Sequence, residues 1–482
     1  MNKILIPVFL LLCSSFFVSA ADKPNVLFLM SDDLNTALSG FGHPQCKTPH
    51  LEKLADKGVR FDNMHCQYPI CGASRASLMT GLYPYANGSM GNVGVNRKTP
   101  GLVTLPELFR ENGYLSVRVG KIYHMRIPME VISGEASFDD PKSWDETYNM
   151  KAPEQHAAGK GTDWSPKDKG SQTFRGVEAE GGDSVHADGM AADKAIELLG
   201  KLKDKPFFLA VGFVRPHVPL VAPTKYFDLY NREDMVAPVV PEDDLEDVPQ
   251  IARGYKANNT TYGVTPELHK GLLQAYYASV SYMDAQVGRI LEALKDNGLD
   301  KNTIVVFTSD HGYLLGHHHK FQKQHLFEES TRVPFIFSVP WMDKQHGAAT
   351  GKVTELIDVF PTLTELAGLK APKTLQGTSL SPLLKDPASC DWTQTEAFTV
   401  SRSGGESLRN ENWRLIQWGN GTLGTELYDR RNDPGEFTNL AENPKYAATL
   451  EKLRNRLLEV RKEAGFDPAK HQKNKKSTKR KK

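Results

Sequence analysis

Three short apolar runs, each followed directly by polar residues, stand out in the hydrophobic pattern of the chain. The runs cover residues 25–30, 206–213 and 303–308, and they lead into Asp32-Asp33, Arg215-Pro216-His217 and Ser309-Asp310-His311. Apolar runs of this length, bounded by polar residues, are typical of buried parallel strands. We therefore expect three strands that each carry polar side chains at the carboxyl end.

Helical periodicity separates these runs. Residues 191–202 and 272–294 show the spacing of amphipathic helices, so strands and helices alternate along the chain. Alternation of this kind predicts an α/β fold with a large, mostly parallel sheet flanked by helices. Sites in such folds lie at the carboxyl ends of the strands, so the three polar clusters are expected to converge.

Two long stretches, residues 125–185 and 221–264, have little periodicity, and the first is rich in Gly, Asp, Lys and Pro. Loops of this length inside a compact domain are usually functional or disordered. We interpret both as insertions that shape the entrance for a substrate.

The character of the chain changes after Pro387. Residues 397–400, 413–418 and 426–428 read as short strands separated by turns, and residues 446–463 read as a helix. This pattern predicts a smaller C-terminal α+β subdomain with a short antiparallel sheet and a helix. The predicted organisation is a signal peptide (1–20), a catalytic domain (21–388), a C-terminal subdomain (389–466) and a basic disordered tail (467–482).

The first twenty residues have the composition of a secretory signal peptide. Lys3 precedes an apolar stretch over residues 4–18, and Val18-Ser19-Ala20 provides a small-residue cleavage site. No later segment reaches the roughly 18 apolar residues of a membrane span. We predict an exported protein, periplasmic or secreted, without an integral membrane segment. A lipid anchor at Cys13 is disfavoured because Leu12 precedes it.

The number of cysteines and the distribution of charge further narrow the class of protein. Four cysteines remain after residue 20, too few for a disulfide framework in a chain of this length. The formal net charge is +1, but residues 470–482 hold eight Lys or Arg and no acid, so the remaining body is acidic. A solubilising, disordered end is favoured over a polyanion-binding tail, and we predict no nucleic-acid partner.

The pairs Asp32-Asp33 and Asp310-His311 are candidates for a metal site. Each pair follows a predicted strand, so three carboxylates and an imidazole can meet at one point. Oxygen ligands of this kind suit Ca²⁺ or Mg²⁺. Either pair alone would read as a turn; together they favour a metal.

Cys71 has two readings from its residues alone. A catalytic thiolate would require a His and an Asn or Asp to activate it, and the chain has 15 His. A buried free cysteine near a helix start, with Leu78 and Met79 on the following turns, is equally compatible with the pattern. Both readings stay open on this basis.

The run Cys71-Gly72-Ala73-Ser74-Arg75-Ala76-Ser77-Leu78-Met79-Thr80-Gly81 also resembles the signature of the type I, formylglycine-dependent sulfatases. Four further stretches are most similar to the iduronate-2-sulfatase branch of that family: residues 120–124, 207–219, 276–291 and 308–323. Together the resemblance spans roughly residues 24–384. It implies an alkaline-phosphatase-like fold and a sulfatase activity.

The resemblance also implies a cofactor set and roles for individual residues. A maturation enzyme, of the formylglycine-generating or the radical type, would oxidise Cys71 to Cα-formylglycine (3-oxoalanine). One Ca²⁺ would be held by Asp32, Asp33, Asp310, His311 and an oxygen of modified Cys71. Arg75, Lys121, His124, His217 and Lys323 would surround the sulfate, with His217 as the acid for the leaving group, Lys323 beside it, His124 as the base and Arg75 holding the aldehyde. Within His317-His318-His319, a loop flanking the pocket, His318 is predicted to touch the substrate.

Two positions depart from the family signature. Ala73 stands where many members have Pro, and Leu82 replaces an Arg that often follows Thr-Gly. The role of that Arg, and so the effect of Leu82, is not assigned.

The implied substrate is a 2-O-sulfated uronic acid at the end of a sulfated polysaccharide. The alternatives are another sulfated sugar of an algal or mucin-type glycan, a phosphatase or phosphodiesterase of the same superfamily with paired Zn²⁺, and a non-catalytic polyanion-binding protein.

Overall fold

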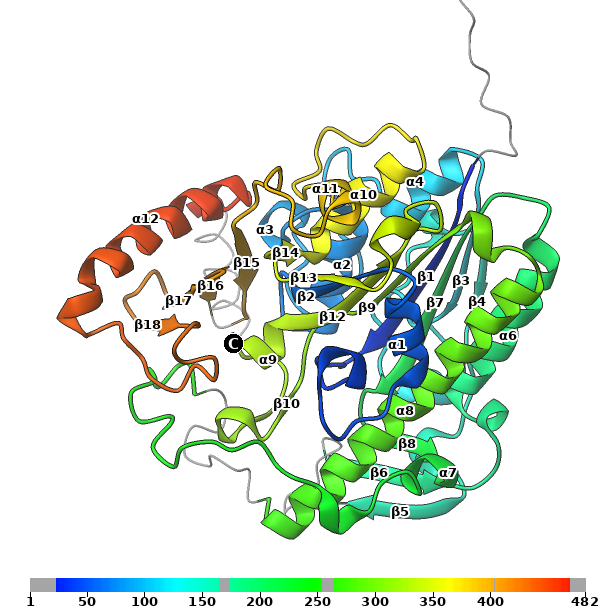
Figure 1. The fold of residues 1–482 in the computed structure, drawn as a ribbon, viewed down its shortest axis with the longest axis horizontal. Helices are drawn as coiled ribbons and strands as arrows, with labels where there is room; N and C mark the ends of the chain where they lie inside the picture. Colours follow the sequence, from blue (N-terminus) through cyan, green and yellow to red (C-terminus); the bar gives the residue numbers. More distant parts are fainter. Residues whose placement is uncertain (1–22, 164–173, 254–263, 403, 469–482) are drawn as a thin grey trace, which may run out of the picture.

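The computed structural model describes residues 23–163, 174–253, 264–402 and 404–468 (Figure 1). The predicted signal peptide and residues 469–482 of the basic tail lie outside these ranges. Within the described part of the chain, no helix has both the length and the apolar character needed to cross a membrane.

A nine-stranded sheet forms the centre of the protein, with β1 (Asn25–Asp32) in its middle. β1 lies between β7 (Phe207–Pro216) and β9 (Thr303–Ser309), and it pairs in parallel with both. The prediction of three buried parallel strands is confirmed. Because the three are direct neighbours, their polar carboxyl ends meet at one edge of the sheet.

The other strands extend this sheet on both sides. The main path runs β13-β2-β12-β9-β1-β7-β3-β4, and β14 also pairs with β2. β12 is antiparallel to β2 and to β9, so the sheet is mostly parallel rather than wholly so. The bounds of these strands are β2 Val59–His65, β3 Leu115–Gly120, β4 Glu146–Tyr148, β12 Arg332–Ser338, β13 Ala348–Thr350 and β14 Thr354–Glu355.

Helices cover both faces of the sheet, as the alternation along β1 requires. Leu27 and Leu29 pack into a core with α1 (Pro49–Ala55), α6 (Ala187–Leu202) and α8 (Pro266–Asp296). Val26, Phe28 and Met30 point to the other face, where their core includes α2, α4, α10 and α11. Those helices span Cys71–Thr80, Leu105–Glu111, Val359–Leu366 and Ser381–Lys385.

Helix α8 begins six residues before the predicted start. Thr265 caps it by accepting a hydrogen bond from the Leu268 amide (3.3 Å), and Pro266 occupies the first turn. A Thr cap followed by Pro is a strong start signal, because it satisfies a free amide and presets the backbone.

The C-terminal subdomain, orange to red on the left of Figure 1, is an antiparallel sheet beside a helix. Its strands are β15 (Glu396–Val400), β16 (Gly405–Asn410), β17 (Trp413–Trp418) and β18 (Gly424–Asp429), and its helix is α12 (Ala447–Glu463). The sequence prediction omitted β16. The predicted boundary at residues 388/389 falls between α11 and β15 and stays a prediction.

The two stretches read as insertions contain more regular structure than expected. β5 (Gly159–Asp163), β6 (Arg175–Ala179) and β8 (Leu220–Pro223) form a separate three-stranded sheet beside α8 (Figure 1). A small hairpin, β10 (Leu314–Leu315) and β11 (Phe321–Gln322), carries the three histidines 317–319 between its strands. The remaining short helices are α3 (Pro84–Asn87), α5 (Met129–Ser133), α7 (Thr224–Phe227) and α9 (Glu328–Thr331).

Candidate active site

The carboxyl ends of β1 and β9 bring the predicted metal ligands together around Cys71, the first residue of α2. Ligand atoms of Asp32, Cys71, Asp310 and His311 all lie within 4.8 Å of one another. Each of these residues is buried, with at most 1% of its surface exposed. Asp33 and His217 form a second group with the same Cys71. Both groups share one sulfur, so they describe a single centre.

The donor atoms of this centre fit a hard cation. Asp33 Oδ2 is buried and has no hydrogen-bond partner among the described residues. His311 Nδ1 lies 2.9 Å from the Gly312 carbonyl and can donate to it, which turns Nε2 toward the centre. That Nε2 lies 3.4 Å from both Cys71 Sγ and Asp33 Oδ1. Carboxylate oxygens with one imidazole nitrogen suit Ca²⁺, the ion that the resemblance implies.

Two lysines neutralise the carboxylates at the end of β1. Lys121 Nζ forms an ion pair with Asp32 Oδ2, and Lys323 Nζ donates to Asp33 Oδ1 at 2.5 Å. Burial alone would raise the pKa of Asp32, but the charges of Lys121, His217, Arg75 and Lys323 lower it well below its ordinary value. The carboxylates are therefore ionised at neutral pH and available to a cation.

Lys323 lies next to Cys71, with its Nζ 3.3 Å from Sγ. The backbone on both sides of it is unusual, because Gln322 (φ 77°) and Gln324 (φ 74°) adopt the left-handed region. Asp33 does the same, with φ 62°. Non-glycine residues in this region are strained, and such strain gathers at functional sites. Here it directs Lys323 and Asp33 toward the same sulfur.

Lys121 reaches Asp32 because two glycines let β3 and β7 approach closely. A Cβ atom on Gly120 would lie 2.1 Å from the Gly212 carbonyl oxygen, and one on Gly212 would lie 1.9 Å from the Lys121 carbonyl oxygen. Gly120 also has a φ of 69°, which only glycine adopts without strain. Larger side chains at either position would displace Lys121.

Arg75 lies beside the predicted metal ligands, and its predicted contact with the aldehyde and the sulfate stays a prediction. Its guanidinium donates to Asp310 Oδ2 (2.8 Å) and Asp32 Oδ1 (3.2 Å), and also to the carbonyls of Lys121 (2.6 Å) and Ile122 (2.9 Å). It is fully buried. The structure thus shows Arg75 orienting two carboxylates of the centre.

His217 enters the site on a loop that other residues hold in place. Its Nδ1 donates to the Val218 carbonyl (2.7 Å), and its Nε2 faces Asp33 Oδ2 at 3.8 Å. Arg215 donates to the carbonyls of His217 (2.6 Å) and Pro219 (2.5 Å) and pairs with Glu154 (2.5 Å). Burial, offset in part by Asp33, lowers the pKa of His217 to about 4.

Sequence reasoning did not identify Arg215 and Glu154 as supports of the site. Arg215 stands in the Arg-Pro-His run, so its position next to His217 was a usable signal. Glu154 lies in a stretch without periodicity, and nothing in the sequence pairs it with Arg215.

His124 and His318 lie outside the contacts of the centre. His124 is 7% exposed and packs on Phe138 at 5.2 Å between ring centroids; burial and Lys121 lower its pKa to about 3. His318 stacks on Phe327 at 3.7 Å, and its Nδ1 lies 3.1 Å from Asp244 Oδ2. These contacts give His318 a structural role and leave its predicted substrate contact without support.

The two departures from the family signature are accommodated inside the fold. Ala73 is fully buried against the C-terminal subdomain, in a cluster with Tyr68 and Phe398. Leu82 is also buried, at 7% exposure. Nothing in the structure explains the replacement of Arg by Leu82.

The structure disfavours Cys71 as a thiolate nucleophile. Burial, together with the nearby Asp32 carboxylate, raises the pKa of its thiol well above the ordinary value. Reactive cysteines instead have lowered pKa values in electropositive, partly exposed surroundings. A neutral thiol inside a ring of carboxylates and lysines is a poor nucleophile. The same surroundings suit an oxygen nucleophile and an anionic ester, which is the chemistry of metal-assisted ester hydrolases.

Comparison with known proteins narrows that class. The family profile described as Sulfatase matches residues 24–369, and the profile described as N-sulphoglucosamine sulphohydrolase, C-terminal, matches residues 316–463. A sulfatase of Formosa agariphila is 35% identical over 455 residues, covering 90% of this chain and 86% of the relative. The iduronate 2-sulfatase of Mus musculus is 33% identical over 413 residues, covering 73% and 70%.

The fold is shared with a wider set of hydrolases. A phosphonate monoester hydrolase from Silicibacter pomeroyi superposes with a TM-score of 0.76 at 23% identity, over 91% of this chain and 95% of that one. At this identity the likeness concerns the fold alone. Since the sulfatase profile covers most of the chain, the protein belongs to the sulfatase family. It is a sulfuric ester hydrolase with the alkaline-phosphatase-like fold that the sequence predicted.

Proposed function

We propose that this sulfatase is an exported, exo-acting enzyme that removes a 2-O-sulfate from a uronic acid at the end of a sulfated polysaccharide. Its nucleophile would be formylglycine made from Cys71, with one Ca²⁺ beside it. The observation that carries the proposal is the position of Cys71 Sγ, which lies 3.4 Å from Nε2 of His311 and 3.3 Å from Lys323 Nζ. Support for the sugar comes from the iduronate 2-sulfatase relative.

Position 71 would carry the covalent chemistry. A hydrated aldehyde there presents two hydroxyls on one carbon, one able to attack sulfur and the other able to release sulfate by losing its proton. A bound Ca²⁺ would act as a Lewis acid that favours the ionised oxygen. Asp32, Asp33, Asp310 and His311 would hold that ion, and Arg75 would keep Asp32 and Asp310 in place.

The cations of the chain would bind the sulfate. Sulfate esters spread negative charge over several oxygens, so positive groups fixed near sulfur stabilise the transition state. Lys323 lies closest to position 71, and Lys121 stands on the other side of Asp32. Both are held by ion pairs, and therefore little reorganisation is needed during the reaction.

Two proton transfers complete the reaction. His217, whose Nε2 points into the site beside Asp33, would pass a proton to the departing sugar oxygen; because burial lowers the pKa of His217 to about 4, the neighbouring ammonium of Lys323 would be the source of that proton at neutral pH. His124 would accept the proton from the second hydroxyl at position 71. Burial and Lys121 lower the pKa of His124 to about 3, so its imidazole is neutral at neutral pH and would hold such a proton only briefly.

Mass spectrometry of the peptide containing Cys71 tests the nucleophile. Protein from a maturation-competent host should carry an aldehyde at position 71, and its activity should follow the fraction of modified chain. Full sulfatase activity in protein whose Cys71 is entirely a thiol contradicts the proposal. The same preparation tests export, since the mature chain should begin at Ala21.

A panel of substrates tests the sugar. Terminal 2-O-sulfated uronic acid should be desulfated faster than sulfated fucose, galactose or rhamnose, and release only from chain ends would show exo action. Preference for one of the other sugars would favour an algal or mucin-type glycan. Comparison of aryl sulfate with aryl phosphate, together with metal analysis, separates the sulfatase from a dizinc phosphatase.

A further inference from the structure

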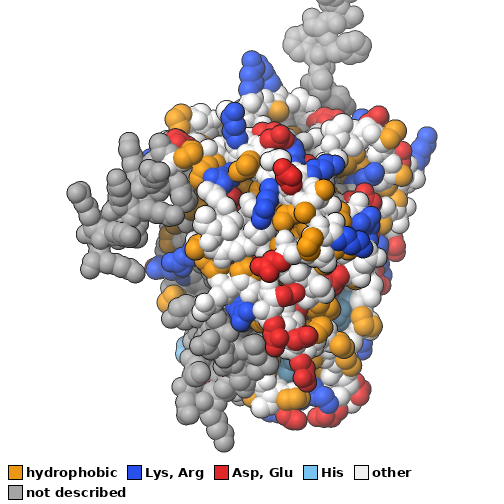
Figure 2. Space-filling view, turned by 90° about the vertical axis from the view of Figure 1, so that its left-hand side faces the viewer, with side chains coloured by type: hydrophobic (Ala, Val, Ile, Leu, Met, Phe, Trp, Pro, Cys, Tyr) orange, Lys and Arg blue, Asp and Glu red, His pale blue; other side chains and the backbone are white. Residues whose placement is uncertain are grey.

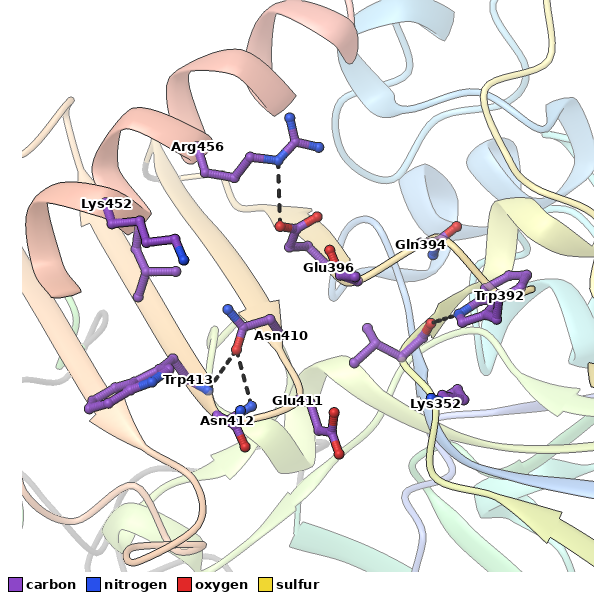
Figure 3. Close-up of a pocket in the computed structure, with 13 residues that line it drawn as sticks. Lys352, Trp392, Gln394, Glu396, Asn410, Glu411, Asn412, Trp413, Lys452 and Arg456 are labelled. Atoms are coloured by element: carbon purple, nitrogen blue, oxygen red, sulfur yellow. Dashed lines mark hydrogen bonds and ion pairs between the residues drawn. The ribbon is translucent and has the colours of Figure 1, made fainter. Parts of the chain in front are cut away.

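A second pocket lies at the junction between the catalytic domain and the C-terminal subdomain (Figure 3). Its volume is about 510 Å³, within the range of about 300–1,000 Å³ typical of small-ligand sites. Helix α12, the β16–β17 turn and the segment before β15 line it, together with Lys352 and Val353 beside β14. It shares no residue with the centre around Cys71.

Aromatic and amide side chains shape this pocket. Figure 3 shows Trp413 and Trp392 at opposite ends of it, with Asn410 between them. Trp392 is fixed as a wall, because its Nε1 donates to the Val353 carbonyl (3.0 Å). Asn410 Oδ1 accepts from the amides of Asn412 (3.0 Å) and Trp413 (2.9 Å), which leaves its NH₂ directed toward α12. Apolar rings with nearby amides match the apolar faces and hydroxyls of sugars.

The charges of the pocket favour an anionic ligand. Three cations line it, and two of them, Lys452 and Arg456, stand one helical turn apart on α12. Arg456 lies 3.5 Å from Glu396, so that pair offsets itself. Within the described residues, neither Lys352 nor Lys452 forms an ion pair. Together they outweigh the exposed Glu411, and each ammonium is available to an anion.

The surface around the subdomain agrees with this sign. Figure 2 shows the face on which the C-terminal subdomain lies. Lys and Arg side chains are spread over its upper half among some Asp and Glu, whereas Asp and Glu side chains gather in a band in its lower half. An anionic chain is therefore attracted to the upper part and repelled from the lower part.

We infer that this pocket is a second binding site for a sulfated oligosaccharide, occupied by an internal segment of the polysaccharide whose end is the substrate. The inference rests on the proposed function for the identity of the polymer. Trp413 and Trp392 would contact sugars at the two ends of the bound segment, Asn410 would donate to a hydroxyl, and Lys352 and Lys452 would bind sulfate groups. Bound there, the enzyme would remain on the polymer between successive turnovers.

The test measures binding, so that its result does not depend on catalysis. The Cys71→Ala protein is titrated by calorimetry with heparin oligosaccharides and with the same oligosaccharides after chemical desulfation. A Lys352→Glu/Lys452→Glu pair in that background should weaken binding of the sulfated probe about tenfold or more, because two attractive contacts become repulsive. The desulfated probe should bind weakly to both proteins.

A charge-matched control separates a built site from general attraction, including attraction to the basic tail. Lys53→Glu/Lys301→Glu changes the net charge equally and replaces exposed lysines of a different pocket. This control should keep the affinity of the Cys71→Ala protein. Equal weakening by both pairs, or no weakening by the first, overturns the inference.

Activity measurements extend the test. In the Cys71-containing enzyme, Lys352→Glu/Lys452→Glu should leave turnover of a small sulfate ester unchanged and raise KM for the polymer. Polymer KM values equal to those of the unsubstituted enzyme also overturn the inference. Loss of activity on both substrates together with a lowered Tm would mean that the lysine double variant is misfolded. In that case Trp413→Leu is titrated with the same probes instead. The inference then predicts that Trp413→Leu weakens binding of the sulfated probe, and unchanged binding overturns it.

Discussion

Two of the buried groups of charges in the described residues differ in whether every carboxylate oxygen has a partner. One is the centre around Cys71. The other joins the C-terminal subdomain to the catalytic domain, where Glu328 and Glu436 meet Arg409, Arg414 and Arg430. Both are removed from water, so burial penalises every charge in either group.

The carboxylates of the junction group are saturated. Glu328 Oε1 accepts from Arg409 and forms an ion pair with Arg430, while its Oε2 accepts from Arg409 and Arg414. Glu436 Oε1 accepts from Arg414 (2.5 Å) and its Oε2 from the Glu328 amide (2.9 Å). Burial would raise the pKa of Glu328, but these arginines lower it well below its ordinary value. No carboxylate oxygen here is left for a ligand.

In the centre around Cys71, by contrast, one carboxylate oxygen lacks a hydrogen-bond partner among the described residues. This oxygen is Asp33 Oδ2, and His311 turns its Nε2 toward Cys71. Buried polar atoms are normally paired, so an unpaired acceptor indicates a missing ligand. The contrast teaches that burial and charge alone do not mark a functional site. At the centre around Cys71 the distinguishing feature is an open carboxylate oxygen that lies beside an imidazole nitrogen and a sulfur.

The largest effect on activity is expected when the Cys71 side chain, at the middle of the centre, is removed. Cys71→Ala should lower kcat/KM for a sulfate ester by about 10⁴-fold or more, because the nucleophile is lost. Steady-state kinetics measures this. Cys66→Ala, five residues earlier and equally buried, is the control and should keep most of the activity. Substantial activity in Cys71→Ala would mean that another group attacks sulfur.

Breaking the saturated group should affect stability instead. Glu328→Gln leaves three buried arginines short of a counter-charge, which is expected to cost about 3–5 kcal/mol in the free energy of unfolding. Urea unfolding measures it. At urea concentrations below the unfolding midpoint, Ca²⁺ should still bind to the Glu328→Gln protein. If Glu328→Gln lost activity at unchanged stability, the junction group would have a functional role, which we do not expect because its carboxylates are fully paired.

The protonation of Glu426 provides a test in the C-terminal subdomain. Burial raises the pKa of Glu426 to about 7, although Trp418 and Tyr428 donate to it. Because the folded pKa lies above the ordinary value of 4.5, this group stabilises the fold below pH 4.5, and its contribution is lost as the pH rises through 7. The change should be about 3 kcal/mol. Glu426→Gln should flatten unfolding curves across this range; an unchanged pH profile would contradict the shift.

Binding of Ca²⁺ at the centre around Cys71 should stabilise the fold. Ca²⁺ at 100 times its dissociation constant should add about 2.7 kcal/mol to the free energy of unfolding, measured by thermal unfolding with and without a chelator. Asp33→Asn should abolish this gain. Asp284→Asn is the control, since that carboxylate is buried but binds the amides of His50 and Leu51, and it should respond to Ca²⁺ as the native chain does.

The smallest effect is expected where charges are neither buried nor open to a ligand. Arg175 and Asp163 form an exposed ion pair at 3.0 Å between β5 and β6. Arg175→Ala should change the free energy of unfolding by no more than about 0.5 kcal/mol, because solvent screens such pairs. Chemical denaturation is sufficient to check it, and a cost above 2 kcal/mol would show that exposure does not predict the weight of an ion pair here.

The sequence predicted the parts of the site that follow strands. β1, β7 and β9 are apolar over their length, so their ends were recognisable, and parallel pairing then brings Asp32, Asp310 and His217 together. β16 was missed because Glu406 and Arg409 interrupt its apolar pattern. Both are buried, since Glu406 accepts from Tyr85 (2.7 Å) and Arg409 donates to Glu328 (3.1 Å).

Contacts between distant segments were beyond the sequence pattern. Arg75 lies in the recognised motif, but its partners Asp32 and Asp310 stand on two strands far away in the chain. Its role as a support for those carboxylates depends on packing. His318 shows the reverse case, because a histidine-rich loop suggested a ligand-binding surface and its ring is instead enclosed by Phe327 and Asp244.

The depth of Cys71 sets an order of events in the life of the chain. In the folded protein only 1% of this residue is exposed, and α2, which begins with it, is buried along its whole length. Under the proposed function another enzyme must oxidise the side chain, and a folded sulfatase offers that enzyme no access. Oxidation therefore has to come first, while the segment is still extended. A chain that folds too early becomes a stable but permanently inactive product.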